Sequence, residues 1–345
     1  MLILSSLLKK YRERQLMRLL KVHPESGFKH GFSDATINVC GITADNYKDF
    51  LSDLDYMKNH PYNGAYTSII DNKLYLPLLL KNYKENVPGY FYYIDERGLL
   101  PLEDNQFGNQ NTRVSIDVFF NTLAQEKILC LKHTHSSVGE GFMLVKQEKD
   151  VFYLNNEEIS KENLAHLVLS LRQYIVTEYI QQHKYASDIC STSLNTVRFL
   201  LVWDDEEQSF CVPRSFHRFG CDGNIVDNLG SGSGVLVFVD VNTGKITSEG
   251  KYNYKSKGDV FKENIIHPDH NICLTGIQIP NFDKIKGKLI KIFNEISYLR
   301  CAGVDVAVTE GGFKIIEINS LPGLSGIQQG IGLLSDSRIK KVLKK

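Results

Sequence analysis

The chain has 345 residues, of which 42% are hydrophobic, so it can bury a large core divided between two or three domains or lobes. Forty basic residues balance forty acidic ones, and this neutrality argues against a protein that wraps nucleic acid or coats an acidic surface. The seven cysteines form no C-x-x-C pair, which argues against a zinc knuckle or a disulfide framework and favours a reducing cytoplasm.

The first predicted element is a basic helix over residues 4–22. Apolar residues recur near helical spacing with basic residues around them: Leu7, Leu8, Tyr11, Leu16, Leu19 and Leu20, with Lys9, Lys10, Arg12, Arg14 and Arg18. The helix either lies on the body of the protein or touches a membrane surface, and the first is favoured because packed helices commonly have basic solvated faces. A second helix follows residues 43–45 and ends at Pro61, which completes an N-terminal helical region over residues 1–66.

Residues 67–126 are predicted to link this region to the rest of the chain. Asp71 or Asn72 is a suitable cap for a helix that reaches residue 84, with Lys73 at its start. The aromatic residues and glycine turn of residues 90–102 predict a β-hairpin, and a helix follows it. A lysine at a helix start is usually a solvated charge, so Lys73 gains a role only from its context.

A lysine and a loop of small residues then indicate an anion-binding site. A predicted strand contains Lys132, and the loop after it contains Ser136, Ser137, Gly139 and Gly141. Serine and glycine let backbone N–H groups approach phosphate oxygens, and a lysine adds a positive charge. The loop lacks the G-x-x-x-x-G-K-[ST] pattern of a Walker A motif, and a simple hairpin turn fits the same residues.

The middle of the chain places two arginines on neighbouring predicted strands. A helix over residues 161–173 and a strand over residues 175–180 come first. Arg198 lies on the next strand, and Arg218 lies on the strand that returns beside it. The glycine–serine run at residues 230–234 precedes a strand instead of opening a helix, which argues against a dinucleotide-binding loop.

Near the C-terminus, two apolar runs flank a glycine turn and predict a β-hairpin with its loop over residues 310–312. This register pairs Thr309 with Phe313, Ala307 with Ile315, and Asp305 with Glu317. Like charges that face each other across an antiparallel pair repel, so something must offset the repulsion between Asp305 and Glu317.

The two faces of this hairpin differ in character. Side-chain alternation places Asn319 on the face of both acids, and the other face is apolar: Val304, Val306, Val308, Ile316 and Ile318. Two carboxylates and an amide oxygen, without Cys or His, suit a hard cation such as Mg²⁺. For an isolated pair of acids, the simpler interpretation is a surface hairpin with solvated charges.

The order of these motifs resembles the ATP-grasp superfamily of ligases, which includes D-alanine:D-alanine ligase. An Asp on one strand, a glycine turn, and Glu-x-Asn followed by Pro-Gly are similar to the metal-binding end of these enzymes. From about residue 45 onward, S-L-N-T-V-R, R-F-G, V-D-N, H-P and I-P resemble the sugar-transfer-associated branch. The resemblance implies an α+β fold, the ATP-grasp fold, whose two α+β lobes grip the nucleotide, with a small lobe over residues 127–182 and a large lobe over residues 183–345.

The resemblance also implies roles for individual residues. The metal-binding set, for which two Mg²⁺ ions are expected, is Asp305, Glu317 and Asn319. The ATP-binding set is Lys73, Lys132, Ser136, Ser137, Gly139, Gly141, Glu178 and Ile180. Arg198 and Arg218 are predicted to stabilise the transferring phosphoryl group. The residues predicted to contact the substrate are Asn195, Asp227 and Asn228.

The function expected from this resemblance is ATP- and Mg²⁺-dependent ligation of a carboxylate to an amine through an acyl phosphate. The branch is associated with polysaccharide biosynthesis, which implies sugar-linked small molecules as partners, in capsule formation for example, and no nucleic acid. A small-molecule kinase of the same fold is the alternative enzyme. A non-catalytic regulatory protein that binds nucleotide is the alternative of another class, and the presence of the metal-binding set together with Lys132 argues against it. The expected location is the cytoplasm, with no transmembrane segment, and peripheral membrane association stays open.

Overall fold

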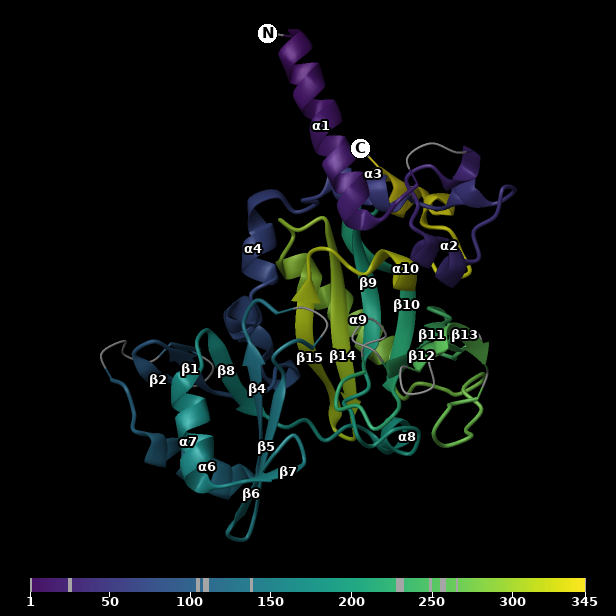
Figure 1. Cartoon of the computed structure of the whole chain (residues 1–345). Helices are drawn as coiled ribbons and strands as arrows, with labels where there is room; N and C mark the ends of the chain where they lie inside the picture. The colour runs from purple at the N-terminus through teal and green to yellow at the C-terminus, as the bar shows by residue number, and fades with distance from the viewer. Residues whose placement is uncertain are drawn as a thin grey trace.

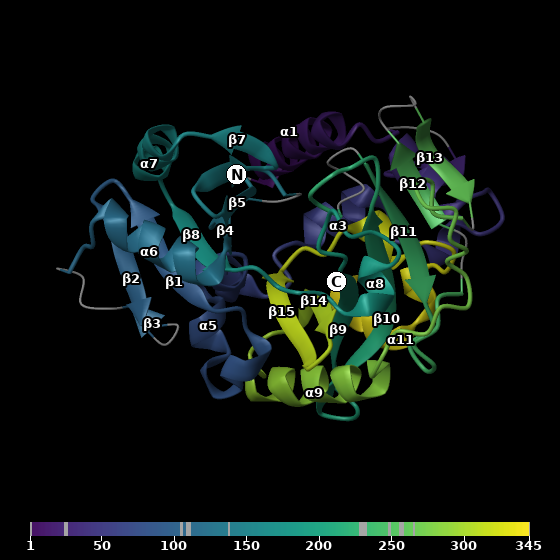
Figure 2. The same ribbon diagram turned by 90° about the horizontal axis from the view of Figure 1, so that it is seen from below.

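The computed structural model describes residues 2–23, 27–103, 106–107, 112–136, 139–227, 233–247, 250–254, 259–264 and 266–344. Two sheets, each with helices on it, form two lobes that face each other (Figures 1 and 2). Neighbouring strands within both sheets run antiparallel. The predicted fold class, α+β with two α+β lobes, is confirmed.

The first sheet has eight strands in the order β3-β2-β1-β8-β4-β5-β6-β7. Its strands are β1 (Tyr90–Asp95), β2 (Gly98–Glu103), β3 (Gln106–Phe107), β4 (Ile128–His133), β5 (Met143–Glu148), β6 (Val151–Leu154), β7 (Glu157–Ile159) and β8 (Tyr174–Glu178). Helices α6 (Ile116–Glu126) and α7 (Lys161–Ser170) bury their apolar residues against it. The hairpin predicted over residues 90–102 therefore belongs to the same sheet as the strand that contains Lys132.

The second sheet has seven strands in the order β13-β12-β11-β10-β9-β14-β15. Its strands are β9 (Val197–Asp204), β10 (Ser209–Gly220), β11 (Ser233–Val239), β12 (Gly250–Tyr254), β13 (Asp259–Asn264), β14 (Cys301–Thr309) and β15 (Gly312–Asn319). Helix α9 (Phe282–Glu295) lies across one face (Figure 2) and buries an apolar stripe at helical spacing, with Phe282, Ile285, Leu289, Ile292 and Phe293. Shorter helices complete this lobe: α8 (Lys184–Ser187), α10 (Leu324–Ile327), η8 (Leu333–Ser335) and α11 (Ser337–Leu343).

The chain before β1 forms one long helix followed by a series of short helices. They are α1 (Leu2–Leu20), η1 (Gly27–Lys29), α2 (Asp34–Cys40), η2 (Tyr47–Asp49), α3 (Asp53–Asn59), η3 (Gly64–Tyr66), α4 (Thr67–Ile70), η4 (Lys73–Tyr75), α5 (Leu76–Leu79) and η5 (Lys81–Asn86). The helix predicted to follow residues 43–45 begins later, because Ser52 caps α3 by accepting from the N–H of Asp55. The single helix predicted up to residue 84 is broken into short turns, although Asn72 does cap η4.

Helix α1 forms as predicted but does not lie along the body. It extends away from the rest of the molecule (Figure 1), and Tyr11 and Leu19 on it are exposed. An ion pair of 2.6 Å joins Glu13 to Lys58 of α3. Across the described residues, no helix combines the length and the apolar character that crossing a membrane requires.

The C-terminal hairpin differs from its predicted register in a way that preserves the acid pair. Its turn has two residues, because Thr309 pairs with Gly312, and the top of the hairpin is shifted by one residue. A bulge at Ile316 then reverses the shift, so Asp305 still pairs with Glu317. The predicted apolar face is therefore wrong at one position: Ile315 is fully buried in the core, and Ile316 turns to the opposite side.

A glycine in β14 allows the chain after β15 to pack closely. A Cβ atom on Gly303 would lie 2.9 Å from the side chain of Pro322 and 3.1 Å from Cδ of Arg198, whereas Gly311 at the turn has open space around it. We predict that Gly303→Ala lowers the free energy of unfolding by about 1–3 kcal/mol through overpacking. Gly311→Ala, in the same hairpin, is the control and should change it by less than about 0.5 kcal/mol. Urea unfolding of both variants tests this, and equal stabilities would contradict the close packing.

Candidate active site

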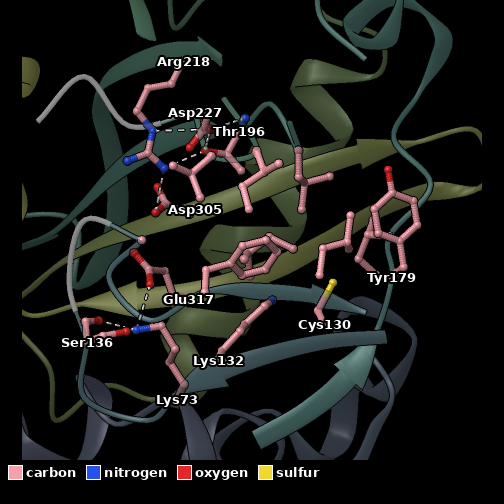
Figure 3. Close-up of a pocket in the computed structure, with 18 of the residues that line it drawn as sticks. Lys73, Cys130, Lys132, Ser136, Tyr179, Thr196, Arg218, Asp227, Asp305 and Glu317 are labelled. Atoms are coloured by element: carbon pink, nitrogen blue, oxygen red, sulfur yellow. Dashed lines mark hydrogen bonds and ion pairs between the residues drawn. The ribbon is translucent and has the colours of Figure 1, made fainter. Parts of the chain in front are cut away.

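A pocket lies between the two sheets and draws its walls from both lobes (Figure 3). The first sheet contributes β4, β5 and the segment after β8, and the second sheet contributes β10, β14 and β15. The loop after β4 contacts the second lobe directly, because a Cβ atom on Gly139 would lie 3.0 Å from Val226. Gly139 has a φ of +77°, a conformation that favours glycine.

One end of the pocket is mainly apolar. Its walls include Cys130, its strand partner Leu144, and Tyr179 with the neighbouring Ile180. Figure 3 shows Cys130 and Tyr179 at this end, away from the carboxylates. Burial raises the pKa of the Cys130 thiol to about 11, so the thiol is neutral at physiological pH. This end suits a flat, weakly polar group.

The opposite end is charged. The Lys73 ammonium donates to the backbone oxygen of Ser136 at 2.5 Å and lies 3.3 Å from Oε2 of Glu317. The Lys132 side chain lies between the two ends (Figure 3), and burial lowers the pKa of its ammonium. Glu178 lines the same pocket and pairs with Lys314 at 3.4 Å.

Asp305 is the most strongly held carboxylate at this end. It is 2% exposed, and both Nε and Nη2 of Arg198 donate to it, the latter at 2.6 Å. Nη2 of Arg218 lies 3.0 Å from Oδ2 of the same carboxylate. Burial alone raises the pKa of Asp305, but the two guanidinium groups outweigh it and lower the pKa below its usual range. Asp305 is therefore ionised at physiological pH.

Arg218 joins Asp305 to a second buried acid. Its Nη2 donates to the hydroxyl of Thr196 at 2.6 Å, and that hydroxyl donates to Asp227 at 2.5 Å. Burial opposes the charge of Arg218, but Asp227, Asp305 and Glu317 outweigh it and raise its pKa. Burial raises the pKa of Asp227. Nε of Arg218 is buried 3.6 Å from Oδ2 of Asp227, an ion-pair contact that is too long for a hydrogen bond.

The predicted metal-binding residues lie together at the base of the hairpin. Asp305 pairs with Glu317 and Gly303 pairs with Asn319, while the amide of Asn319 contacts Oε1 of Glu317 at 3.0 Å. No group of three or more His, Cys, Asp and Glu side chains suited to a metal occurs in the described part of the chain, and this set consists of two acids and an amide. These oxygen donors fit a hard cation such as Mg²⁺, because each carboxylate keeps lone pairs beyond those that accept from Arg198, Arg218 and Lys73.

The structure brings most of the predicted site residues to the pocket. Those that line it are Lys73, Lys132, Ser136, Gly139, Glu178, Ile180, Arg218, Asp227, Asp305 and Glu317. Arg198 lies behind Asp305 and Asn319 lies beside Glu317, so each touches the site through another residue. Gly141 lies against Tyr174, where a Cβ atom would be 2.6 Å from the tyrosine hydroxyl. Ser137 and Asn228 lie outside the described residues.

Asn195 is predicted to contact substrate, but the structure places it inside the fold. It is 1% exposed, and its amide nitrogen donates to Oε1 of Gln182 and to the backbone oxygens of Ala186 and Cys190. Its amide oxygen accepts from the hydroxyl of Ser193 and from the N–H of Gly220. These bonds use the side chain fully, so it holds the segment before β9 in place.

Several pocket residues escape the sequence reasoning. Ile316 faces the pocket because of the bulge, and no local sequence pattern predicts that bulge. Tyr179 lines the pocket together with Glu178 and Ile180, although strand alternation would turn it away. Strand β8 ends at Glu178, so the alternation stops there. Of these residues, only Thr196 could be predicted from the sequence, because it lies between Asn195 and the strand that contains Arg198.

Comparison with known proteins identifies the family of the chain. The family model described as sugar-transfer associated ATP-grasp matches residues 55–343. The chain belongs to this ATP-grasp family. No curated protein matched the chain.

Several solved structures are similar to this ATP-grasp chain. The ATP-grasp ligase PsnB complexed with minimal precursor is 12% identical, with a TM-score of 0.42 over 82% of this chain and 63% of that one. VanG D-Ala:D-Ser ligase from Enterococcus faecalis is 14% identical, with a TM-score of 0.44 over 80% and 61%. D-alanyl-alanine synthetase A from Vibrio cholerae O1 biovar eltor is 11% identical, with a TM-score of 0.45 over 83% and 68%. The chain thus spans less than two thirds of the length of the first two, and similarity at this level says nothing of what it acts on.

Replacing Arg198 or Arg218 with lysine should lower the free energy of unfolding by different amounts. Lysine keeps the charge but loses the planar fork that holds a carboxylate at two points. Arg198→Lys is expected to lower the free energy of unfolding by about 2–4 kcal/mol, because it weakens a buried ion pair that makes two hydrogen bonds. Arg218→Lys should cost less, because Arg218 makes one bond to Thr196 and two longer contacts, with Asp305 and Asp227. Thermal and urea unfolding of both variants tests the order, and the reverse order would refute it.

Proposed function

We propose that this chain is an ATP- and Mg²⁺-dependent ligase that joins a carboxylate to an amine through an acyl phosphate. The observation that carries the proposal is the division of one pocket into an apolar end and a charged end. The charged end combines two lysines with the carboxylates of Asp305 and Glu317. A nucleoside triphosphate has the same division, with a flat base at one end and phosphates at the other.

In this proposal the base of ATP lies between the apolar walls near Tyr179 and Ile180, where backbone groups can read its edge. Glu178 is placed to accept from the ribose hydroxyls. Lys73 and Lys132 contact phosphate oxygens. The loop after β4 covers the phosphates with its backbone N–H groups, and its proposed contacts are Ser136, Ser137, Gly139 and Gly141.

Asp305, Glu317 and Asn319 would hold Mg²⁺ at the phosphate end, and we propose two ions there. Bound Mg²⁺ neutralises phosphate charge and makes the terminal phosphoryl group easier to transfer. Arg198 holds Asp305 in one orientation from behind. Lys73 holds Glu317 from the side of the small lobe. Both carboxylates are therefore oriented by fixed partners before any ligand binds.

The proposed reaction has two steps. A carboxylate oxygen of the substrate attacks the γ-phosphorus while the bond to the ADP oxygen breaks, and an acyl phosphate forms. The amine nitrogen then attacks the acyl carbon, the bond to phosphate breaks, and the amine gives up a proton. The guanidinium of Arg218 lines the pocket, and we propose that its positive charge stabilises the oxygens that gain charge in both steps. Asp227 lines the pocket beside Arg218, and we propose that it and Asn228 contact the substrate.

The substrate proposal rests on the family description, which associates these proteins with sugar transfer. We propose a carboxylate on a sugar or sugar-linked carrier, joined to an amino acid or another amine during polysaccharide or capsule synthesis in the cytoplasm. We also propose that the chain is divided into four parts. These are an N-terminal region over residues 1–66, a linking segment over 67–126, a small lobe over 127–182 and a large lobe over 183–345.

A small-molecule kinase is the second candidate, because the same phosphate end can serve a hydroxyl acceptor. A screen of carboxylates with ATP, Mg²⁺ and hydroxylamine separates the two. Hydroxylamine intercepts an acyl phosphate as a hydroxamate, so a ligase gives ADP and hydroxamate. A kinase gives ADP and a phosphorylated acceptor. Nucleotide binding with no ADP from any acceptor would favour the regulatory protein.

Glu317→Gln tests the phosphate end. We expect ADP formation to fall by about 100-fold or more, because the variant loses a charged metal ligand at the reacting phosphate. The fold should survive, since Glu317 is only partly buried and makes no core contact. Glu310→Gln, at the tip of the same hairpin with a side chain that is 67% exposed, is the matched control and should keep full activity. Normal ADP formation by Glu317→Gln would rule out the proposed site.

A further inference from the structure

Three consecutive residues, from the end of α4 to the first residue of η4, touch both lobes beside the pocket. We call this segment, Asp71, Asn72 and Lys73, the bridging segment. It lies outside both sheets, yet its side chains and backbone contact the loop after β4 on one side and the chain after β15 on the other. Only Lys73 of the three is among the pocket-lining residues.

The contact with the large lobe is a double hydrogen bond. Oδ1 of Asp71 accepts from the backbone N–H of Ser320 at 2.7 Å, and Oδ2 accepts from the hydroxyl of Ser320 at 2.6 Å. Ser320 is fully buried and directly follows Asn319 at the end of β15. Asp71 itself is exposed, so it holds a buried group from the surface of the molecule.

The contact with the small lobe is made by Lys73. Its backbone N–H donates to the oxygen of Thr134 at 3.0 Å, and its ammonium donates to the oxygen of Ser136 in the same loop. The hydroxyl of Tyr90 donates to the backbone oxygen of Lys73 at 3.0 Å, which anchors the lysine to β1. The ammonium of Lys73 also reaches Glu317, so it touches at once the acid pair and the loop after β4, which we call the phosphate loop.

Asn72 fixes the distance between these two contacts. Its side chain is buried and accepts from the N–H of Leu74, which caps η4 and sets the direction of the chain at Lys73. The segment is therefore a short, rigid connection between Ser320 and Thr134. Any shift of Asp71 is transmitted to Lys73 over two residues.

We propose that Asp71 is a positioning residue for the metal-binding end of the pocket, and that the bridging segment sets the distance between the phosphate loop and Asn319. This inference rests on the proposed function. Asp71 acts through Ser320, whose fixed position orients Asn319 and, through the amide contact of Asn319, the carboxylate of Glu317. Partners that orient metal ligands in this way typically change metal affinity by 10–100-fold when they are lost.

Asp71→Asn is the informative change. Asparagine removes the negative charge that strengthens both bonds, and its NH₂ can pair with the Ser320 hydroxyl only if that hydroxyl turns round to accept. The chain after β15 keeps another anchor, since the Tyr56 hydroxyl donates to the oxygen of Pro322 at 2.6 Å. The variant should therefore fold.

The test measures ADP binding by calorimetry with Mg²⁺ and with a chelator. Asp71→Asn should bind Mg-ADP about 10-fold more weakly than the natural chain and bind metal-free ADP equally well. Hydrogen exchange at the Ser320 amide should become faster, because its acceptor is weakened. Ser320→Ala removes only the hydroxyl donor, so it should weaken Mg-ADP binding by a smaller factor. This variant replaces Asp71→Asn in the test if Asp71→Asn does not fold.

Asp53→Asn is the matched control. Asp53 makes the same kind of double contact, to the N–H of Ser33 at 2.9 Å and the hydroxyl of Thr36 at 2.7 Å, but it lies in α3 outside the pocket. The Asp53→Asn variant should be less stable than the natural chain and should bind Mg-ADP with unchanged affinity. Unchanged Mg-ADP affinity in Asp71→Asn or, where that variant does not fold, in Ser320→Ala would overturn the inference, as would an equal loss in Asp53→Asn. If Mg²⁺ does not strengthen ADP binding in the natural chain, the proposed function itself fails.

Discussion

The buried carboxylate of Asp305, held by two arginines, is the interaction on which the site depends. A charge that is 2% exposed is tolerated only when it is paired and fully hydrogen-bonded. The sheet order supplies that pairing, because β9 lies between β10 and β14 and its register places Arg198 directly opposite Asp305. Arg218 reaches the same carboxylate from β10. The three side chains therefore meet through strand pairing, with no contribution from loops.

Because of this arrangement, the stability of the fold depends more on Asp305 than on Glu317. Removing Asp305 would leave Arg198 and Arg218 buried with too little negative charge around them, so both the fold and the site would suffer. Glu317 is less buried, and it is paired at 3.3 Å with Lys73 of the bridging segment and at 3.7 Å with Arg198. Glu317 can thus be changed without exposing an unpaired core charge, which makes it the cleaner probe of chemistry.

The acid pair could be predicted from the sequence because strand alternation and a glycine turn constrain it strongly. The sequence nevertheless predicts a three-residue loop for this hairpin, whereas the actual turn has two residues. The bulge at Ile316 compensates for that difference, and it arises from the packing of Ile315 into the core, which only the tertiary structure determines. The breaks in the helix after Asn72 and the internal role of Asn195 share this origin. Each depends on partners far away in the sequence, such as Thr134 or Gly220.

The pocket can bind a ligand tightly only if its two lobes hold a defined distance, because the apolar end belongs mainly to the small lobe and the acid pair to the large one. The chain passes between the sheets after Glu178, and the side chain of Gln182 there donates to the backbone oxygens of Cys190 and Ser193 in the large lobe. Direct contacts across the pocket also set the distance. Among the described residues these include Gly139 against Val226, the ion pair of Glu178 with Lys314, and the bridging segment between Thr134 and Ser320. Gly139 lies against an apolar side chain, whereas the ion pair and the bridging segment are held by charged or backbone groups. We therefore expect the lobes to separate most easily at Gly139 and least easily at the bridging segment when a ligand enters.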